Sequence, residues 1–375
     1  MSDGGAVNDG GAGNSMVPWR QATEAALYGP DGFFVRPDTE QPGGPAAHFR
    51  TSVHASPLFA RAVLRLVEWV DEGLGRPDRL VVCDVGAGRG ELLAALAQLT
   101  DGTELGARLE LRAVERAARP DGLPDAIAWG AEIEPLPHGL LFANEWLDNV
   151  PVDVAELADD GEDDEDGEDG EDGEDGGDGV PRYLLVDPAT GEEQPGPGLT
   201  PEDAAWLAAQ YPDLPPGGRA ELGLPRDRAW SEAVAALGRG LAVTADYAHT
   251  RDARPPFGTL TGYRNGRQVA PLPDGSCDLT AHVALDSCLD AAARTNPRVT
   301  HSLWTTQRAA LRALGVSGAR PPLALASSDP TGYLRALSAA GEAAELIAVG
   351  GLGSFLWGAQ AVDMEIPVGW QTLCP

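Results

Sequence analysis

The sequence predicts an α/β protein whose central sheet is mostly parallel and doubly wound, with helices on both faces. Two observations predict this class. Short apolar runs typical of buried strands alternate along the chain with segments of helical periodicity. The first of these runs, residues 80–85, leads into a glycine loop and then into a stretch of good helix formers. A strand, a glycine loop and a helix in this order are typical of sheets that bind nucleotide-like ligands.

The individual elements follow from the same patterns. An amphipathic helix is expected over 57–73, because apolar residues recur there at three- and four-residue spacing. The core strands are expected at 80–85, 109–115, 126–129, 139–146 and 241–246. Further helices are expected at 91–99, 200–210, 228–237, 305–314 and 332–340, and Thr200 is able to cap the second of them. Strand-like runs at 151–157 and 182–186 flank a repetitive acidic tract, which we interpret as a disordered insertion at a hairpin tip.

These patterns divide the chain into five segments. We expect a disordered tail, a helical lid, the first part of the sheet, an inserted substrate subdomain containing the acidic tract 158–179, and the second part of the sheet. Their predicted bounds are 1–18, 19–78, 79–150, 151–239 and 240–375.

The charge of the chain limits its partners. There are 27 Lys and Arg residues against 58 Asp and Glu, for a formal net charge of −31. Residues 159–178 hold 14 acidic residues and no basic ones, so the rest of the chain still carries 27 − (58 − 14) = −17. Nucleic-acid phosphates and anionic membranes repel such a surface. We therefore expect neither as a partner, whereas a basic protein suits the surface.

The cysteines and the N-terminal residues indicate the cellular compartment in which the protein is expected. The four cysteines are scattered, without the spacing of a zinc site or of a disulfide framework. The N-terminal residues lack the basic and apolar segments of a secretory signal. Both features favour the cytoplasm.

The glycine loop indicates the type of cofactor. Its glycines have the spacing G-x-G-x-G, whereas dinucleotide-binding folds prefer G-x-G-x-x-G around a pyrophosphate. Glu91 takes the place of the last glycine of that motif, where it suits a pyrophosphate poorly. Charge favours S-adenosylmethionine, which carries a sulfonium and an amino group, over a nicotinamide cofactor. We assign to this cofactor the loop residues Asp84, Gly86, Ala87, Gly88 and Gly90.

Two residues after the next strands complete the predicted cofactor site. Glu115 ends the second strand, where a carboxylate in such folds accepts the ribose hydroxyl protons. The alternative is a surface glutamate beside Arg116. Trp129 ends the third strand and either stacks on the adenine or packs in the core.

The segment after the fourth strand reads Asn144-Glu145-Trp146-Leu147-Asp148-Asn149-Val150-Pro151. It resembles the N-E-x-x-D-A-x-P segment of the MidA-like methyltransferases, a family that includes the mitochondrial complex I assembly methyltransferase. Four other segments are similar to family segments in the same order, namely 28–34, 48–59, 246–249 and 278–283. The last matches the family's D-L-T-A-H-V. The chain departs from the pattern at His48, 53–55, Asn149 and Ala248, which leaves the substrate less defined than the cofactor.

The resemblance implies a class I methyltransferase fold and, as in the mitochondrial member, methylation of an arginine in a protein such as a respiratory complex subunit. Asn144 and Glu145 are then expected to hold the acceptor, with Asp148 sharing its charge or proton. Asp246 and His282 are expected to border the acceptor pocket. Thr51 is expected in a lid over the cofactor, together with the aromatic residues of 28–34.

Other interpretations of the sequence stay open. Asn144 and Asp148 can instead cap the next helix, with Glu145 structural. The chain can also be a catalytically weak assembly factor or chaperone that keeps the cofactor fold. A nicotinamide dehydrogenase is disfavoured, because its G-x-G-x-x-G motif is missing. The sequence does not indicate the oligomeric state.

Overall fold

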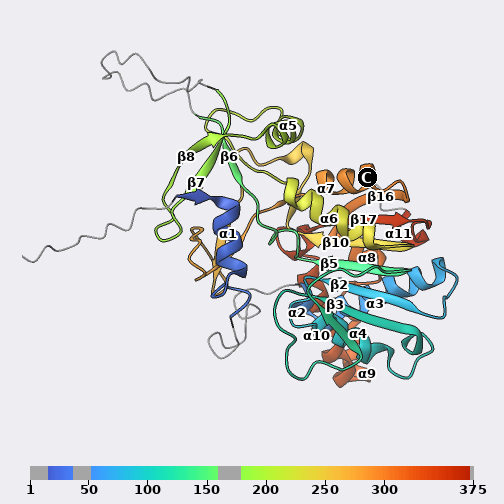
Figure 1. Ribbon diagram of the computed structural model, residues 1–375. Coiled ribbons are helices and arrows are strands. Elements are labelled where there is room, and N and C mark those ends of the chain that lie inside the picture. Colours follow the sequence, from blue (N-terminus) through green and yellow to red (C-terminus); the bar gives the residue numbers. More distant parts are fainter. Residues whose placement is uncertain (1–15, 37–51, 159–178, 372–375) are drawn as a thin grey trace, which may run out of the picture.

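A computed structural model describes residues 16–36, 52–158 and 179–371 (Figure 1). At its centre lies a seven-stranded sheet in the order β16-β17-β10-β5-β2-β3-β4. The parallel strands are β2 (Leu80–Val85), β3 (Leu109–Val114), β4 (Ile127–Gly130), β5 (Gly139–Asn144) and β10 (Gly240–Asp246). These are the five predicted core strands. β17 (Leu356–Val362) runs antiparallel to both β10 and β16 (Val299–Thr306).

Helices cover both faces of this sheet, as predicted. Alternate residues of a strand point to opposite faces. In β2, Leu80 and Val82 pack in one core cluster with helices α3 (Pro57–Gly73) and α4 (Glu91–Thr100). Val81, Cys83 and Val85 pack in a second cluster with α6 (Leu224–Ala236) and α7 (Leu285–Thr295). Because β2, β5 and β10 are buried on both faces, their sequences are continuous apolar runs rather than alternating ones.

Helix α3 has the bounds that its periodicity predicted. Pro57 stands at its first turn, and the Ser56 hydroxyl accepts a hydrogen bond from the Leu58 amide at 3.0 Å. On the same side of the sheet lie α8 (Gln307–Ala313), α10 (Pro330–Leu346) and the short α2 (Ser52–Ala55), α9 (Leu323–Ser328) and α11 (Val368–Gln371).

A second, smaller sheet lies beside the large one next to α1 (Trp19–Tyr28) (Figure 1). Its strands are β1 (Val17–Pro18), β6 (Val154–Glu156), β7 (Arg182–Val186), β8 (Glu193–Gly198) and β9 (Arg219–Glu221). β6 and β7 form the antiparallel pair expected around the acidic tract, and residues 159–178 of the tract lie outside the described residues. β1 belongs to the predicted tail 1–18, but Val17 and Pro18 pair with β7, so the tail prediction is wrong for these two residues.

The predicted subdomain 151–239 contains α5 (Pro201–Gln210), which Thr200 caps as expected, with its hydroxyl 3.2 Å from the Asp203 amide. α6 also falls in this range but covers the large sheet, because Trp230, Ala233 and Val234 present an apolar stripe to β2 and β5.

The remaining strands connect β10 to α7. They are β11 (Ala248–His249), which pairs with β15 (Val283–Ala284), and a three-stranded sheet of β12 (Thr261–Arg264), β13 (Arg267–Val269) and β14 (Asp278–Thr280). In the described part of the chain, no helix combines the length and the apolar composition that crossing a bilayer requires.

Candidate active site

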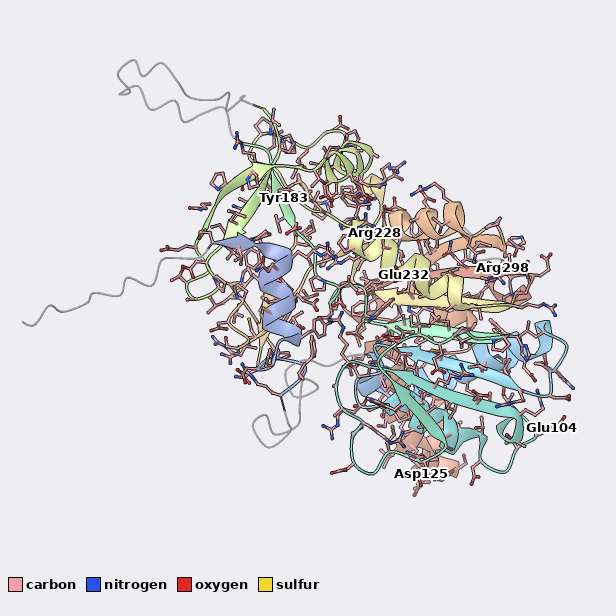
Figure 2. All side chains as sticks on the ribbon, in the orientation of Figure 1. Glu104, Asp125, Tyr183, Arg228, Glu232 and Arg298 are labelled. Atoms are coloured by element: carbon pink, nitrogen blue, oxygen red, sulfur yellow. The ribbon has the colours of Figure 1, made fainter. Side chains whose placement is uncertain are left out.

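A cavity of about 1270 Å³ lies at the carboxyl ends of the parallel strands. Residues that follow β2, β3, β4 and β5 line it, together with α6, the segment after α1, and the small β12-β13-β14 sheet. In Figure 2, Glu232 on α6 marks one wall of the cavity, and Glu104, in the turn before β3, lies at the far end of the large sheet. Parallel α/β sheets place their ligands at the carboxyl edge.

The glycine loop after β2 forms one end of the cavity. Gly86 and Gly88 have positive φ angles of 71° and 58°, which only glycine adopts at little cost. A Cβ atom on Gly86 would lie 2.9 Å from the Trp146 ring, whereas one on Gly88 would come no closer than 3.6 Å to another atom, Glu91 Oε2. The backbone at Gly88 is therefore open to a ligand, as the motif predicts.

Glu115 and Asp84 make this end of the cavity acidic. The Glu115 carboxylate accepts hydrogen bonds from the amides of Gly88 at 3.0 Å and Ala117 at 3.1 Å. The carboxyl group of Asp84 is buried, and burial raises its pKa well above the usual value, with further contributions from Glu91 and Glu115. A bound cation would stabilise the ionised form of Asp84, so this end of the cavity suits a cationic cofactor.

Four arginines also line the cavity, and each already contacts the protein. Arg116 forms an ion pair with Glu24 at 2.7 Å and lies 4.2 Å above the Tyr28 ring. Arg36 donates to the Asp31 carbonyl, and Arg119 donates to carbonyls at 123, 124 and 127. The fourth is Arg89. Arg116 thus connects the end of β3 with helix α1.

Two predicted cofactor residues do not join the described cavity. Trp129 is absent from its lining, packs against the core of the large sheet, and donates its indole N–H to the Ala117 carbonyl at 3.1 Å. The core alternative for Trp129 is therefore favoured over adenine stacking. Thr51 lies outside the described residues. Of the lid aromatics, Tyr28 and Phe34 line the cavity, and Phe33 is fully buried beside them.

The other end of the cavity is formed by the residues after β5. Asn144 ends the strand, and Glu145 follows with a positive φ of 52°, an uncommon conformation for glutamate that is typical of constrained functional sites. Glu145 Oε1 accepts hydrogen bonds from the Asn144 side-chain amide at 2.9 Å and from the Ser52 backbone amide at 3.0 Å. No helix lies between β5 and β6, whose connecting residues the structure describes, so helix capping by Asn144 and Asp148 is wrong.

Asp148 lies in the same cavity, where hydrogen bonds from three other residues fix its position. Its carboxylate accepts hydrogen bonds from the Thr280 hydroxyl at 2.9 Å and from the Asn149 side-chain amide at 3.0 Å. Arg226 donates to the Asp148 carbonyl at 2.7 Å. Burial raises the pKa of the Asp148 carboxyl, although its hydrogen bonds and Arg226 oppose the shift.

Three buried acceptor atoms of this cavity have no hydrogen-bond partner among the described residues. They are the side-chain Oδ1 atoms of Asn144, Asn149 and Asp278. The two amides are oriented by the carboxylates beside them, since each donates its N–H to Glu145 or Asp148 and leaves its oxygen unpaired. Buried acceptors without partners are costly, so the arrangement favours a ligand rich in N–H groups.

Asp278, Asn149 and Tyr247 were missed as site residues from the sequence. All three line the cavity. Asp278 stands in the D-L-T-A-H-V segment, which was the one available signal. Because Asp278 is far from β5 along the chain, the sequence does not indicate that β14 places it in the same cavity.

Asp246 and His282 are close to the site but absent from the cavity lining. Asp246 is fully buried, and its carboxylate accepts the backbone amides of Leu147 at 2.9 Å and Asp148 at 3.2 Å. The His282 ring stacks on Tyr247 with 6.0 Å between centroids, and its backbone amide donates to the Thr259 hydroxyl. The structure favours positioning roles for both, because neither side chain reaches the space a substrate would occupy.

The sheet order with an antiparallel β17, the glycine loop and the acid after β3 define a class I methyltransferase fold. Residues 60–302 match the model of a family described as "Putative S-adenosyl-L-methionine-dependent methyltransferase". The chain belongs to this family, which confirms the resemblance seen in the sequence, and its cofactor is S-adenosylmethionine.

Solved structures agree on the fold. The chain is similar to a Burkholderia thailandensis protein crystallised with S-adenosyl-homocysteine, with a TM-score of 0.71 and 23% identity over 94% of this chain and 90% of that one. It is also similar to a native crystal structure of an uncharacterised protein from the same organism, with a TM-score of 0.69 and 23% identity over 94% and 89% of the two chains. The search of curated proteins gave no match.

Proposed function

We propose that this protein transfers the methyl group of S-adenosylmethionine to an arginine side chain of a basic protein, such as a subunit of a respiratory complex. One observation carries the proposal. The end of the cavity beyond the glycine loop contains the carboxylates of Glu145 and Asp148, and the same cavity lining holds three acceptor atoms that have no hydrogen-bond partner among the described residues. A guanidinium has five N–H donors, a positive charge and no acceptor, so it complements these groups better than other protein side chains do.

The cofactor is assigned to the end of the cavity with the glycine loop. Gly86, Gly88 and Glu115 fit it, because the backbone there is open and the carboxylate lies at the loop. When bound, S-adenosylmethionine supplies an electrophilic methyl group on a sulfonium.

The acceptor residues then position the attacking nitrogen. Glu145, fixed by the Ser52 amide and by Asn144, holds the guanidinium so that one nitrogen faces the methyl group. Transfer of the methyl group to this nitrogen would leave S-adenosyl-homocysteine, and a carboxylate of the cavity would accept the proton that the nitrogen gives up. We expect the segment around Tyr28, which lines the cavity, to exclude water from it.

A labelling experiment tests the proposal. Purified protein is incubated with basic proteins and radiolabelled S-adenosylmethionine, and the labelled residues are identified by mass spectrometry. We expect methylarginine, and we expect Glu145→Gln to reduce its formation at least 100-fold while cofactor binding persists. Label confined to small molecules or to other residues would contradict arginine methylation. Cofactor binding without transfer to any protein would favour the assembly-factor alternative.

A further inference from the structure

Asp278 has a carboxyl group in the cavity to which the mechanism above gives no role of its own. Asp278 is the first residue of β14, in the small sheet that packs near the end of α1, and only 4% of its surface is exposed. It lines the cavity, and its Oδ1 atom has no hydrogen-bond partner among the described residues. Since Glu145 follows β5 of the large sheet, the two carboxyls come to the cavity from separate parts of the fold.

The charged groups near Asp278 are carboxylates, which carry the same sign of charge as ionised Asp278. Burial raises its pKa well above the usual value and the nearby carboxylates of Asp148 and Glu145 raise it further, whereas a hydrogen bond with the Leu279 backbone amide opposes the shift. Among the described residues, no basic side chain is one of the groups that shift the pKa of Asp278. Asp148 differs, because both of its carboxylate oxygens accept hydrogen bonds from the protein. A buried acid with one unpaired oxygen among like charges is unfavourable in the free protein and gains from a bound cation.

We propose that Asp278 is a specificity-determining residue that receives an N–H pair of the arginine guanidinium, so that two carboxyls from two sheets, Glu145 and Asp278, hold one cation. This inference rests on the proposed arginine acceptor. Two acceptor groups at separate positions match the planar, forked donors of a guanidinium, whereas the ammonium of lysine is a compact point charge. The neutral ureido group of citrulline has the shape of the guanidinium without its charge, and Asp278 discriminates against it.

Peptide binding tests the inference. The protein loaded with S-adenosyl-homocysteine is titrated with acetyl-Gly-Arg-Gly-amide, and with its citrulline and lysine counterparts, by calorimetry. We expect Asp278→Asn to weaken binding of the arginine peptide roughly 10- to 100-fold, and to change citrulline binding little. A bound cation lowers the pKa of Asp278, so this residue should release a proton when the arginine peptide binds. Titration in two buffers of different ionisation enthalpy measures the protons released. The unaltered protein should release more of them than Asp278→Asn does.

The controls separate binding from folding. Asp290→Asn, an exposed residue on α7, removes the same charge outside the cavity and should leave every value unchanged. Affinity for S-adenosyl-homocysteine reports the fold of each variant, and Asp278→Ser serves as a second variant with a smaller side chain. Equal arginine affinity in the unaltered protein and in a folded Asp278 variant overturns the inference while the arginine acceptor stands. Absence of arginine binding to the unaltered protein overturns both.

Discussion

At the scale of single residues, the site depends on backbone conformations that few side chains adopt. Gly86 has a positive φ and lies directly under Trp146. Glu145 also has a positive φ, although its side chain makes this conformation unfavourable. Glutamate in this conformation costs about 1 kcal/mol or more. The conformation aims the carboxylate at the Ser52 amide and into the cavity, so the cost is consistent with a functional constraint.

The close packing at Gly86 leads to a prediction about cofactor binding. Gly86→Ala should lower the affinity for S-adenosylmethionine at least 10-fold, because the new methyl group displaces Trp146, whose side chain lines the cavity. Gly75→Ala is the matched control. Gly75 has a φ of 79°, similar to the 71° of Gly86, but a Cβ atom there meets no atom within 4 Å.

Both variants should lose about 1 kcal/mol of stability from backbone strain, measured by urea unfolding. Calorimetry should show weaker cofactor binding only for Gly86→Ala. Similar affinities for the two variants would mean that the loop does not bind the cofactor.

At the scale of helices and strands, hydrogen bonds to buried acids connect the segments that form the site at the carboxyl edge of the sheet. Asp246 ends β10 and fixes the turn after β5 through two backbone amides. Asp227 of α6 accepts hydrogen bonds from Trp206 of α5 at 2.9 Å and from Ser287 of α7 at 2.7 Å, which ties the subdomain helix α5 to the large sheet. These buried acids position elements rather than substrates.

The burial of Asp246 leads to a prediction about pH. Burial and the neighbouring Asp148 raise its pKa well above the unfolded value of 3.8. Between these two pKa values the folded state binds more protons than the unfolded state, so this group makes stability fall as pH rises. Asp246→Asn, which keeps an acceptor oxygen, should remove this part of the pH dependence, by up to about 1.4 kcal/mol per pH unit.

Urea unfolding between pH 5 and pH 8 measures the effect. The stability of Asp246→Asn relative to the unaltered protein should increase as pH rises, whereas the exposed control Asp213→Asn should follow the unaltered protein. Parallel curves for the two Asn variants would show that Asp246 is ionised in the folded protein at all of these pH values.

At the scale of the whole molecule, the acidic charge should act on the encounter with a basic substrate rather than on the chemistry. Residues 159–178 contribute 14 of the 58 acidic residues. β6 and β7 on either side of them pair directly, with Glu156 opposite Arg182, so a short turn can replace the tract without altering the pair. The cavity is lined by other parts of the chain.

Deleting residues 159–178 should therefore leave kcat unchanged and lower kcat/KM for a basic protein several-fold at low salt. The reason is that the net charge changes from −31 to −17, which weakens the electrostatic attraction of the basic protein. The difference should shrink at 0.5 M salt, where charges are screened. Shortening the loop should stabilise the fold by about 1 kcal/mol. Methylation rates at two salt concentrations test this, and a loss of kcat would show that the tract acts in catalysis.

The sequence by itself determined the features that are local in the chain. The five parallel strands, helix α3, the cap at Thr200 and the glycine loop follow from periodicity, capping residues and glycine spacing, all of which act within a few residues. Family membership also followed from ordered local segments. Local patterns were misleading for Val17 and Pro18, whose strand exists only because β7 lies beside them.

Only the tertiary structure decided which side chains share the cavity. Asp246 and His282 carry the family pattern as clearly as Asp278 does, yet the fold turns the first two away from the cavity and brings Asp278 into it. Similarly, Trp129 packs against the core, where the Ala117 carbonyl in the loop after β3 accepts the indole N–H. The physical reason is that contacts between distant segments depend on how strands and sheets pack, and the sequence of one segment does not encode its distance from another.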